Sequence, residues 1–515
     1  MREQARPEHR QRRPRDGGSR TPTPRALRYR QLVNPFPPLR IFSDDAIEAI
    51  HQSALQILAE QGMRVLLPAA RRIFADAGAI VDESQEHVRL GPDIVAHGLA
   101  QLRPSAELIA LAPERNVRVG APHVAIVPVA GPPNVNDHVR GRRPGTLQDF
   151  CDFIRLAQMC DVVHLLGPSV EAQDVPLEMR HLDLTLAQLT LSDKVPFVWA
   201  RGTAQVLDCF AMIRLAHGLD EAAFRAQPRC WTNINTNSPR QLDAVMAQGI
   251  IDFASAGQLT IITPFTLAGA MAPITLAGAL TLAHAEALLG IVLAQLVRPG
   301  APVVYGGFTS NVDMKSGSPA FGTPEFVKAS LGTGQLARFL GLPWRGSNAT
   351  GSAVADEQAT YESAMSLWGT FMGGVNILLH GAGWLEGGLV ASFEKFIIDV
   401  EMLQIMAEIL QPVPASAAEI GLQAIAEVAP GGHFFSSAHT LERYRDAFYA
   451  PLISDWSNFG QWMEGGGRTA SQRATSTWQR MLREFTPPVR DPGVLEAIQT
   501  FAARRRAEGG ALPTA

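Results

Sequence analysis

Large aromatic rings recur at the ends of apolar segments in this sequence. Four of them are Trp199, Phe265, Phe308 and Trp384. The face of an aromatic ring carries negative potential and attracts alkylated ammonium groups, a contact worth about 0.5–2 kcal/mol per ring. These residue types in these positions therefore predict a site for a small organic cation, although some of the rings could simply pack beneath the loops.

Two carboxylates follow the same segments. Asp313 and Glu386 are our candidates for a catalytic role, in which their negative charge complements the bound cation more strongly in a dry cavity than in water. Each has an alternative: Asp313 could form a surface salt bridge with Lys315, and Glu386 could brace its loop. The sequence holds no HxH, HExxH or CxxC pair, so we predict no metal site.

Eight apolar segments position these residues. Each ends near Gly, Asn or an aromatic residue and precedes a helix-length stretch, the pattern of a strand, a loop and a crossover helix. The pattern predicts an α/β fold with a closed, parallel (β/α)8 TIM barrel whose chemistry lies at the carboxyl ends of the strands. The segments are HVAIVPV (123–129), VVHLLG (162–167), PFVWA (196–200), CWTNIN (230–235), LTIITPF (259–265), PVVYGGF (302–308), PWRGSNA (343–349) and NILLHGAG (376–383).

The rest of the chain divides around this barrel. We predict a disordered basic tail at 1–32, an α+β lead-in at 33–122, the barrel at 123–410 and a C-terminal helical appendage at 411–515. Residues 1–30 carry ten Arg against three acidic residues, and their composition offers no apolar periodicity from which to build a core. A tail of this kind can touch nucleic acid or lipid, but we favour a solvated leader without either partner.

Composition indicates an ordinary cytoplasmic protein. The 515 residues are 46% hydrophobic and 18% charged, with a net charge of −4 and four cysteines in no paired spacing. Residues 267–297 are apolar enough to suggest a membrane span, yet Pro273, His284, Glu286 and Gln295 interrupt the run. We expect a packed core helix there, and a homo-oligomer is compatible with the sequence.

Several motifs, in order along residues 33–480, resemble the trimethylamine methyltransferase family. The resemblance implies a barrel enzyme that moves a methyl group from a methylated amine to the cobalt(I) of a corrinoid protein. The motifs are AEQGMRV (59–65), INTNSPRQLD (234–243), LAGAMAPIT (267–275), YGGFTSNVDMKSGSPAFGTPE (305–325), DEQATYESAMSLWG (356–369), GAGWLEGGLVASFEKFIIDVE (381–401) and PGGHFFSSAHT (430–440).

One departure from the family pattern bears on the substrate. Archetypal members carry pyrrolysine in a barrel loop that we place near residues 345–360, but residues 346–358 read GSNATGSAVADEQ, with no lysine. Members without pyrrolysine include ones that demethylate quaternary amines such as glycine betaine. A quaternary nitrogen leaves as a neutral tertiary amine, so it needs no extra activation. We therefore expect a quaternary amine as substrate, no tightly bound cofactor, and a corrinoid supplied by a partner protein.

Residue roles follow from position at the strand ends. We predict that the four rings named above form the walls of the cation cage, and that Asn235 and Asn348 orient any carboxylate tail of the substrate. Two other classes stay open. One is a zinc-using barrel methyltransferase or a lyase, and the other is a non-catalytic protein that binds quaternary amines.

Overall fold

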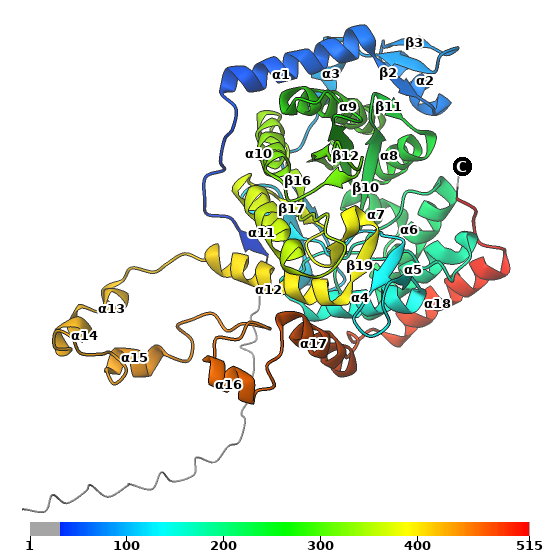
Figure 1. Ribbon diagram of the computed structural model, residues 1–515. Helices are drawn as coiled ribbons and strands as arrows, with labels where there is room; N and C mark the ends of the chain where they lie inside the picture. The colour runs from blue at the N-terminus through cyan, green and yellow to red at the C-terminus, as the bar shows by residue number, and fades with distance from the viewer. Residues whose placement is uncertain (1–30, 514–515) are drawn as a thin grey trace, which may run out of the picture.

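The computed structural model describes residues 31–513, and it shows a mixed α/β fold with a large central sheet surrounded by helices (Figure 1). The predicted disorder of the basic tail therefore lies almost entirely outside the described residues. None of the eight predicted strand segments is helical. The α/β class expected from the alternation of strands and helices is confirmed.

Six of the eight segments form strands that pair in parallel. The order of pairing is β10–β12–β13–β16–β17–β7. The other two segments, 162–167 and 196–200, form single parallel bridges, Leu165 to Val195 and Phe197 to Trp231. The six strands are β7 (His123–Ile126), β10 (Trp231–Asn237), β12 (Leu259–Ala268), β13 (Val303–Gly306), β16 (Trp344–Ser347) and β17 (Ile377–Leu379).

The sheet is not purely parallel. Its strand path runs from β1 at one end to β3 at the other instead of closing on itself, and several short strands join it in antiparallel pairs. Closure of the barrel therefore stays a prediction. The added strands are β1 (Leu32–Val33), β2 (Met63–Val65), β3 (Ile80–Asp82), β4 (His87–Arg89), β11 (Gln241–Leu242), β14 (Phe308–Val312) and β15 (Pro319–Ala320).

Helices cross between successive strands. Several begin at a capping side chain: Thr146, Thr275, Thr323, Asp356 and Ser392 each accept a hydrogen bond from a backbone N–H in the first turn. These caps fix the first residue of each helix. They therefore also fix the last residue of the loop that joins it to the preceding strand. The helices are α4 (Leu147–Met159), α5 (Leu177–Leu191), α6 (Thr203–His217), α8 (Ala244–Ala256), α9 (Leu276–Val297), α10 (Pro324–Phe339), α11 (Glu357–Met372) and α12 (Phe393–Ile409).

The apolar helix α9 is a core helix by its burial. It is the one described helix long and apolar enough to span a membrane, and 78% of its most apolar window is buried inside the protein. Its polar residues are satisfied internally. His284 bonds His51 at 2.9 Å and the Tyr305 hydroxyl at 2.8 Å, while Glu286 accepts from the Ser238 hydroxyl at 2.6 Å.

The segment before β7 is small and mixed. Ser43 caps α1 (Asp44–Gln56), as its position before two aspartates predicts, and a π-helical turn, Ile57–Gln61, continues it to Gly62. This segment packs on α9 through α1 and α3 (Figure 1). Its remaining elements are α2 (Pro68–Asp76), α3 (Pro92–Leu99), β5 (Ala106–Leu108) and β6 (Val117–Val119).

The chain after α12 is helical in two parts. Helix α17 (Ala470–Glu484) packs on α12 and α4, and α18 (Pro492–Ala507) packs on α5 and α6. Four short helices between α12 and α17 stand away from the body in Figure 1, and the segments that join them expose large side chains such as Phe435, Phe448 and Trp456. They are α13 (Ala417–Ile420), α14 (Leu422–Glu427), α15 (Ala438–Arg443) and α16 (Phe459–Glu464).

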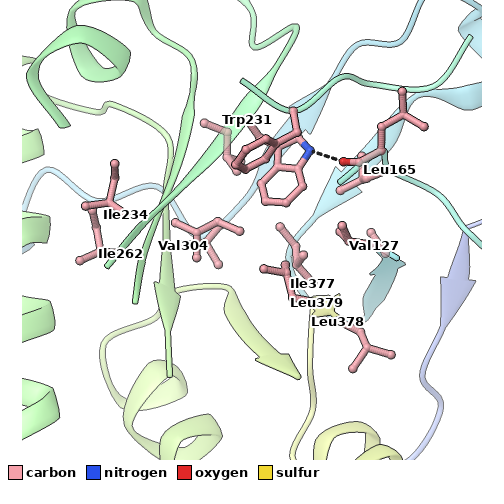
Figure 2. Close-up of a cluster of buried hydrophobic side chains, with 14 of the residues drawn as sticks. Val127, Leu165, Trp231, Ile234, Ile262, Val304, Ile377, Leu378 and Leu379 are labelled. Carbon is pink, nitrogen blue, oxygen red and sulfur yellow. Dashed lines mark hydrogen bonds between the residues drawn. The ribbon is translucent and has the colours of Figure 1, made fainter. Parts of the chain in front are cut away.

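Side chains from separate strands share one interior. Figure 2 shows Trp231 of β10 among Val127, Leu165, Val304 and Ile377, which come from other strand segments. All five are fully buried, and the indole N–H donates to the Leu166 carbonyl at 3.2 Å. Packing of this kind fills the space between the strands and leaves the strand ends for chemistry.

Candidate functional site

Three of the four predicted cage rings meet at the carboxyl ends of the strands. Phe308 stacks on Phe265 with ring centroids 5.4 Å apart and meets Trp384 edge-on at 6.0 Å. His380, Phe321 and Phe326 also contact the Phe308 ring, at 5.4, 5.2 and 6.2 Å. We call these six rings the Phe308 cluster.

The backbone places the Phe308 cluster by close strand pairing. In the parallel register of β12 and β14, Phe265 lies opposite Phe308. A Cβ on Gly307, the residue between β13 and β14, would lie 2.2 Å from the Thr333 side chain, so only glycine fits there. Gly388, at φ +104°, lies against the Trp384 indole, where a Cβ would come within 2.6 Å. Glycine therefore lets both strand ends approach the rings.

A buried cation lies beside these rings. Arg345, on β16, is 2% exposed, and its guanidinium carbon lies 5.4 Å from the Phe308 ring centroid. One of its terminal nitrogens donates to the Gly307 carbonyl at 3.2 Å. Burial lowers the pKa of Arg345 to about 9, so the side chain is still cationic at neutral pH.

His380 lies beside the Trp384 indole. Its ring centroid is 3.8 Å from that of Trp384, and its backbone adopts φ +57° at the end of β17. Burial, and secondarily the charge of Arg345, hold the pKa of His380 well below its usual value of 6.5. The imidazole is therefore neutral at physiological pH, so one ring nitrogen donates a hydrogen bond and the other accepts one.

Comparison with known proteins agrees with the motifs in the sequence. The sequence model of the trimethylamine methyltransferase (MTTB) family matches residues 8–510.

The chain belongs to the trimethylamine methyltransferase family.

Its relatives within the family are methyltransferases, and so is this enzyme. A glycine betaine methyltransferase from Desulfitobacterium hafniense is 34% identical, over 92% of this chain and 99% of the relative. Trimethylamine methyltransferases from Desulfitobacterium hafniense and Methanosarcina barkeri are 28% and 26% identical, over 87% and 90% of this chain and 90% and 94% of theirs. Among solved structures, the Methanosarcina barkeri monomethylamine methyltransferase matches at 11% identity and a TM-score of 0.46, over 88% of this chain and 92% of that one.

The fourth predicted ring of this methyltransferase family member lies apart. Trp199 contacts Phe197 edge-on at 5.1 Å and Phe150 at 6.0 Å, and among the described residues no ring contact joins it to the Phe308 cluster. It is 9% exposed. These contacts are those of a packing residue beneath the loops, so its part in the cage stays a prediction without support from the geometry.

The two predicted carboxylates are engaged elsewhere. Asp313 is exposed in a turn, where it accepts from the Ser316 hydroxyl at 2.6 Å; this bond and two backbone N–H groups lower the pKa of its carboxyl. Glu386 pairs with Arg142 at 3.1 Å, while its backbone N–H donates to the Ser352 carbonyl. The geometry fits the brace that was the alternative for Glu386. The salt bridge of Asp313 with Lys315 does not form.

The two predicted amides differ in their surroundings. Asn235 is exposed on β10, and its side-chain oxygen accepts from the Asn233 amide at 2.7 Å. Asn348 is buried, donates to the Gly381 carbonyl at 3.1 Å, and leaves its own oxygen without a partner among the described residues. Of the two predicted amides, only Asn348 keeps a buried polar atom without a partner among the described residues.

Several supporting residues were not predicted. Lys395 and Asp399 form a fully buried ion pair, and Asp399 also accepts from the Gly383 N–H at 2.8 Å, one residue before Trp384. Glu362 accepts from the Thr350 hydroxyl and from the Gly351 N–H at 2.9 Å. This carboxylate fixes the loop that follows β16. An arginine inside the apolar segment PWRGSNA was the sequence signal for Arg345.

The described residues contain no group of three or more His, Cys, Asp or Glu side chains that could hold a metal ion. The four cysteines all carry free thiols, and burial raises the pKa of Cys151 to about 11 and that of Cys160 to about 12. These thiols are therefore protonated at neutral pH and are poor nucleophiles.

Proposed function

We propose that this protein is a corrinoid-dependent methyltransferase that removes a methyl group from a methylated amine, specifically a quaternary amine such as a betaine. The Phe308 cluster carries the proposal. Its rings lie at the strand ends, and Phe265 is half-buried there. Stacked and edge-on rings of this kind suit a methylated cation, which gains cation–π attraction without needing a hydrogen bond.

The choice of a quaternary amine has two further supports. One relative with 34% identity is named a glycine betaine methyltransferase. The loop that would carry pyrrolysine is held by Glu362 in this chain and contains only standard residues without lysine. Trimethylamine needs protonation or another form of activation before its nitrogen can leave, whereas a quaternary nitrogen does not.

The strands would form the predicted closed barrel. The two single bridges, Leu165 to Val195 and Phe197 to Trp231, lie in the gap between β7 and β10, and the His164 N–H donates to the Ile126 carbonyl of β7 at 2.8 Å. The shared interior around Trp231 (Figure 2) supports the same arrangement. In this proposal residues 123–410 are the catalytic barrel, with the lead-in and the C-terminal appendage packed around it.

The residues of this chain would bind the methylated amine and orient it. The corrinoid, carried by a partner protein, would supply the nucleophile that accepts the methyl group. The rings of the Phe308 cluster hold the cation with one methyl group facing the open strand ends, and the burial of Trp384, His380 and Arg345 keeps water from the opposite side. Alignment of the methyl carbon in this way lowers the barrier through positioning alone.

The rim of the strand ends suits a docking protein. Five exposed apolar side chains follow five different strands, in the loops at their carboxyl ends; they are Val139, Ile274, Met314, Val354 and Leu389. Ile274 and Met314 approach the same point above Gly269, within 3.7 Å and 3.3 Å of the position of a Cβ there. This rim would receive the corrinoid protein, and we place both proteins in the cytoplasm.

The two alternative functions can each be tested separately. A zinc-using methyltransferase or lyase would contain stoichiometric zinc, which metal analysis of the purified protein would detect. A non-catalytic protein would bind quaternary amines without transferring a methyl group.

The experiment for the proposal is a calorimetric binding screen of glycine betaine, proline betaine, carnitine, choline and trimethylamine. We expect a quaternary amine to bind most tightly. Tightest binding of trimethylamine, or no binding of any of the five, would contradict it.

A further inference from the structure

The guanidinium of Arg345 is buried without a counter-ion. It is 2% exposed, and among residues 31–513 no carboxylate lies within ion-pair distance of it. Burial is the cause of its lowered pKa, with no carboxylate charge acting on it. Its Nε has no hydrogen-bond partner in the described part of the chain. The side chain makes one hydrogen bond, to the Gly307 carbonyl, and one ring contact, with Phe308.

The other buried cations of this chain are compensated. Arg71 pairs with Glu83 at 2.7 Å and donates to the Val65 carbonyl. Lys395 pairs with Asp399, and Lys194 donates to three backbone carbonyls. An isolated buried charge costs several kcal/mol unless it is paired. Among residues 31–513, Arg345 is therefore the one buried arginine or lysine that has neither a carboxylate partner nor a full set of carbonyl acceptors.

Buried polar atoms without partners also occur at the end of β16, which carries Arg345, and at the end of β17, its neighbour in the sheet. Ser347 lies two residues further along β16, and so on the same face of the strand. Its hydroxyl and the Nδ1 atom of His380 are buried and have no partner within residues 31–513. The amide oxygen of Asn348 is unpaired as well. A guanidinium, a hydroxyl and a neutral imidazole together supply N–H and O–H donors for one planar anion.

We propose that Arg345, with Ser347 and His380, binds the carboxylate of a zwitterionic substrate. Planar guanidinium groups bind carboxylates through two parallel hydrogen bonds. The inference rests on the proposed function and names its substrate class: an amine whose quaternary nitrogen and carboxylate are separated by about one carbon. The spacing follows from the 5.4 Å between the guanidinium carbon and the Phe308 ring, because a short zwitterion can touch both.

The same arrangement excludes simple cations. A substrate without a carboxylate, such as choline, would bring its positive charge close to an uncompensated guanidinium in a site shielded from water. Like charges repel strongly there, so the site selects against such cations as well as for betaines. A longer zwitterion such as carnitine would hold its carboxylate too far from the ammonium group to match both contacts.

Calorimetric titration of the full-length protein with three related ligands tests the proposal. Glycine betaine carries both charges, choline carries only the cation, and 3,3-dimethylbutanoate carries only the carboxylate on a carbon isostere. For Arg345→Gln we expect about 10- to 100-fold weaker binding of glycine betaine and of 3,3-dimethylbutanoate. Choline, relieved of repulsion, should bind as well as or better than to the unchanged protein.

A second arginine variant serves as the control. Arg338→Gln removes an exposed arginine of α10 that donates to the Gly373 carbonyl, outside the Phe308 cluster, and should leave all three affinities unchanged. Unchanged binding of both carboxylates to Arg345→Gln would overturn the anion site, and so would equal losses for all three ligands. Failure of the unchanged protein to bind any quaternary amine would instead overturn the proposed function. Circular dichroism and Arg345→Lys, which keeps the charge without the planar fork, separate a folding defect from a binding one.

Discussion

The guanidinium carbon of Arg345 lies 5.4 Å from the centre of the Phe308 ring, so a positive charge and a ring that attracts positive charge stand side by side. In the free enzyme the ring faces this arginine. A zwitterionic substrate would satisfy both groups at once, with its carboxylate on the arginine and its methylated nitrogen on the rings. The pair therefore links the cation site to a preference for betaines.

The contribution of Trp384 can be measured by removing its ring. Trp384→Ala should weaken binding of glycine betaine by roughly 1–3 kcal/mol, since both cation–π attraction and apolar contact are lost. The ligand 3,3-dimethylbutanoate, in which an uncharged carbon replaces the ammonium nitrogen, should lose less, because only apolar contact is at stake. Equal losses for the two ligands in calorimetry would make Trp384 a packing residue.

The buried pair of Lys395 and Asp399 should stabilise the turn before Trp384. Lys395→Met leaves Asp399 unpaired and should lower the free energy of unfolding by about 3–5 kcal/mol. The double variant Lys395→Met/Asp399→Leu should regain part of that loss, although the Gly383 N–H stays without its acceptor. Urea denaturation is the measurement. A Lys395→Met protein with an unchanged midpoint would show that the pair contributes nothing.

The exposed rim should matter only for the partner protein. Met314→Glu places a charge on an apolar side chain that is 69% exposed at the strand ends. We expect a higher KM for the corrinoid protein with unchanged affinity for the amine. Val489→Glu, at a 97% exposed residue between α17 and α18, is the matched control. If the two variants behave alike, the rim is not the docking surface.

His380 should make stability depend on pH in a defined direction. Its pKa in the folded protein lies well below 6.5, so as pH falls through about 6.5 the unfolded chain takes up a proton that the folded chain does not. Acidification therefore destabilises the fold, by up to about 1.4 kcal/mol per pH unit for each such histidine. The buried His284, with a pKa lowered to about 3, contributes in the same direction. The measurement is urea denaturation between about pH 5 and 7, the range in which histidines titrate. His380→Gln should reduce the slope of the unfolding free energy against pH. An unchanged slope would mean that His380 titrates normally.

Local rules predicted much of the fold. Apolar runs and the Gly, Asn or aromatic residues at their ends located the strand segments and the helix-length stretches between them, since these signals act over a few residues. The short strands added at the edges of the sheet were not predicted. Pairs such as β1 with β7 depend on contacts between segments far apart in the sequence, and a two-residue strand has no periodicity of its own.

The site was predicted in part for the same reason. Position at a strand end was enough to bring Phe265, Phe308 and Trp384 together. It could not show that Asp313 would cap its own turn or that Glu386 would pair with Arg142, because those partners depend on loop conformation. The role of Arg345 could not be predicted, because it rests on the absence of a carboxylate beside the guanidinium. Which groups surround a side chain depends on the packed structure and not on the residue type.

Methyl transfer to a reduced corrinoid tests the central claim most directly. Purified enzyme is mixed with cobalt(I) corrinoid protein and one amine at a time, and formation of the methylated corrinoid is followed by its absorbance. The account predicts turnover with a betaine, faster than with choline and faster than with trimethylamine. Faster turnover of trimethylamine than of every quaternary amine tried, or transfer from none of them, would contradict it.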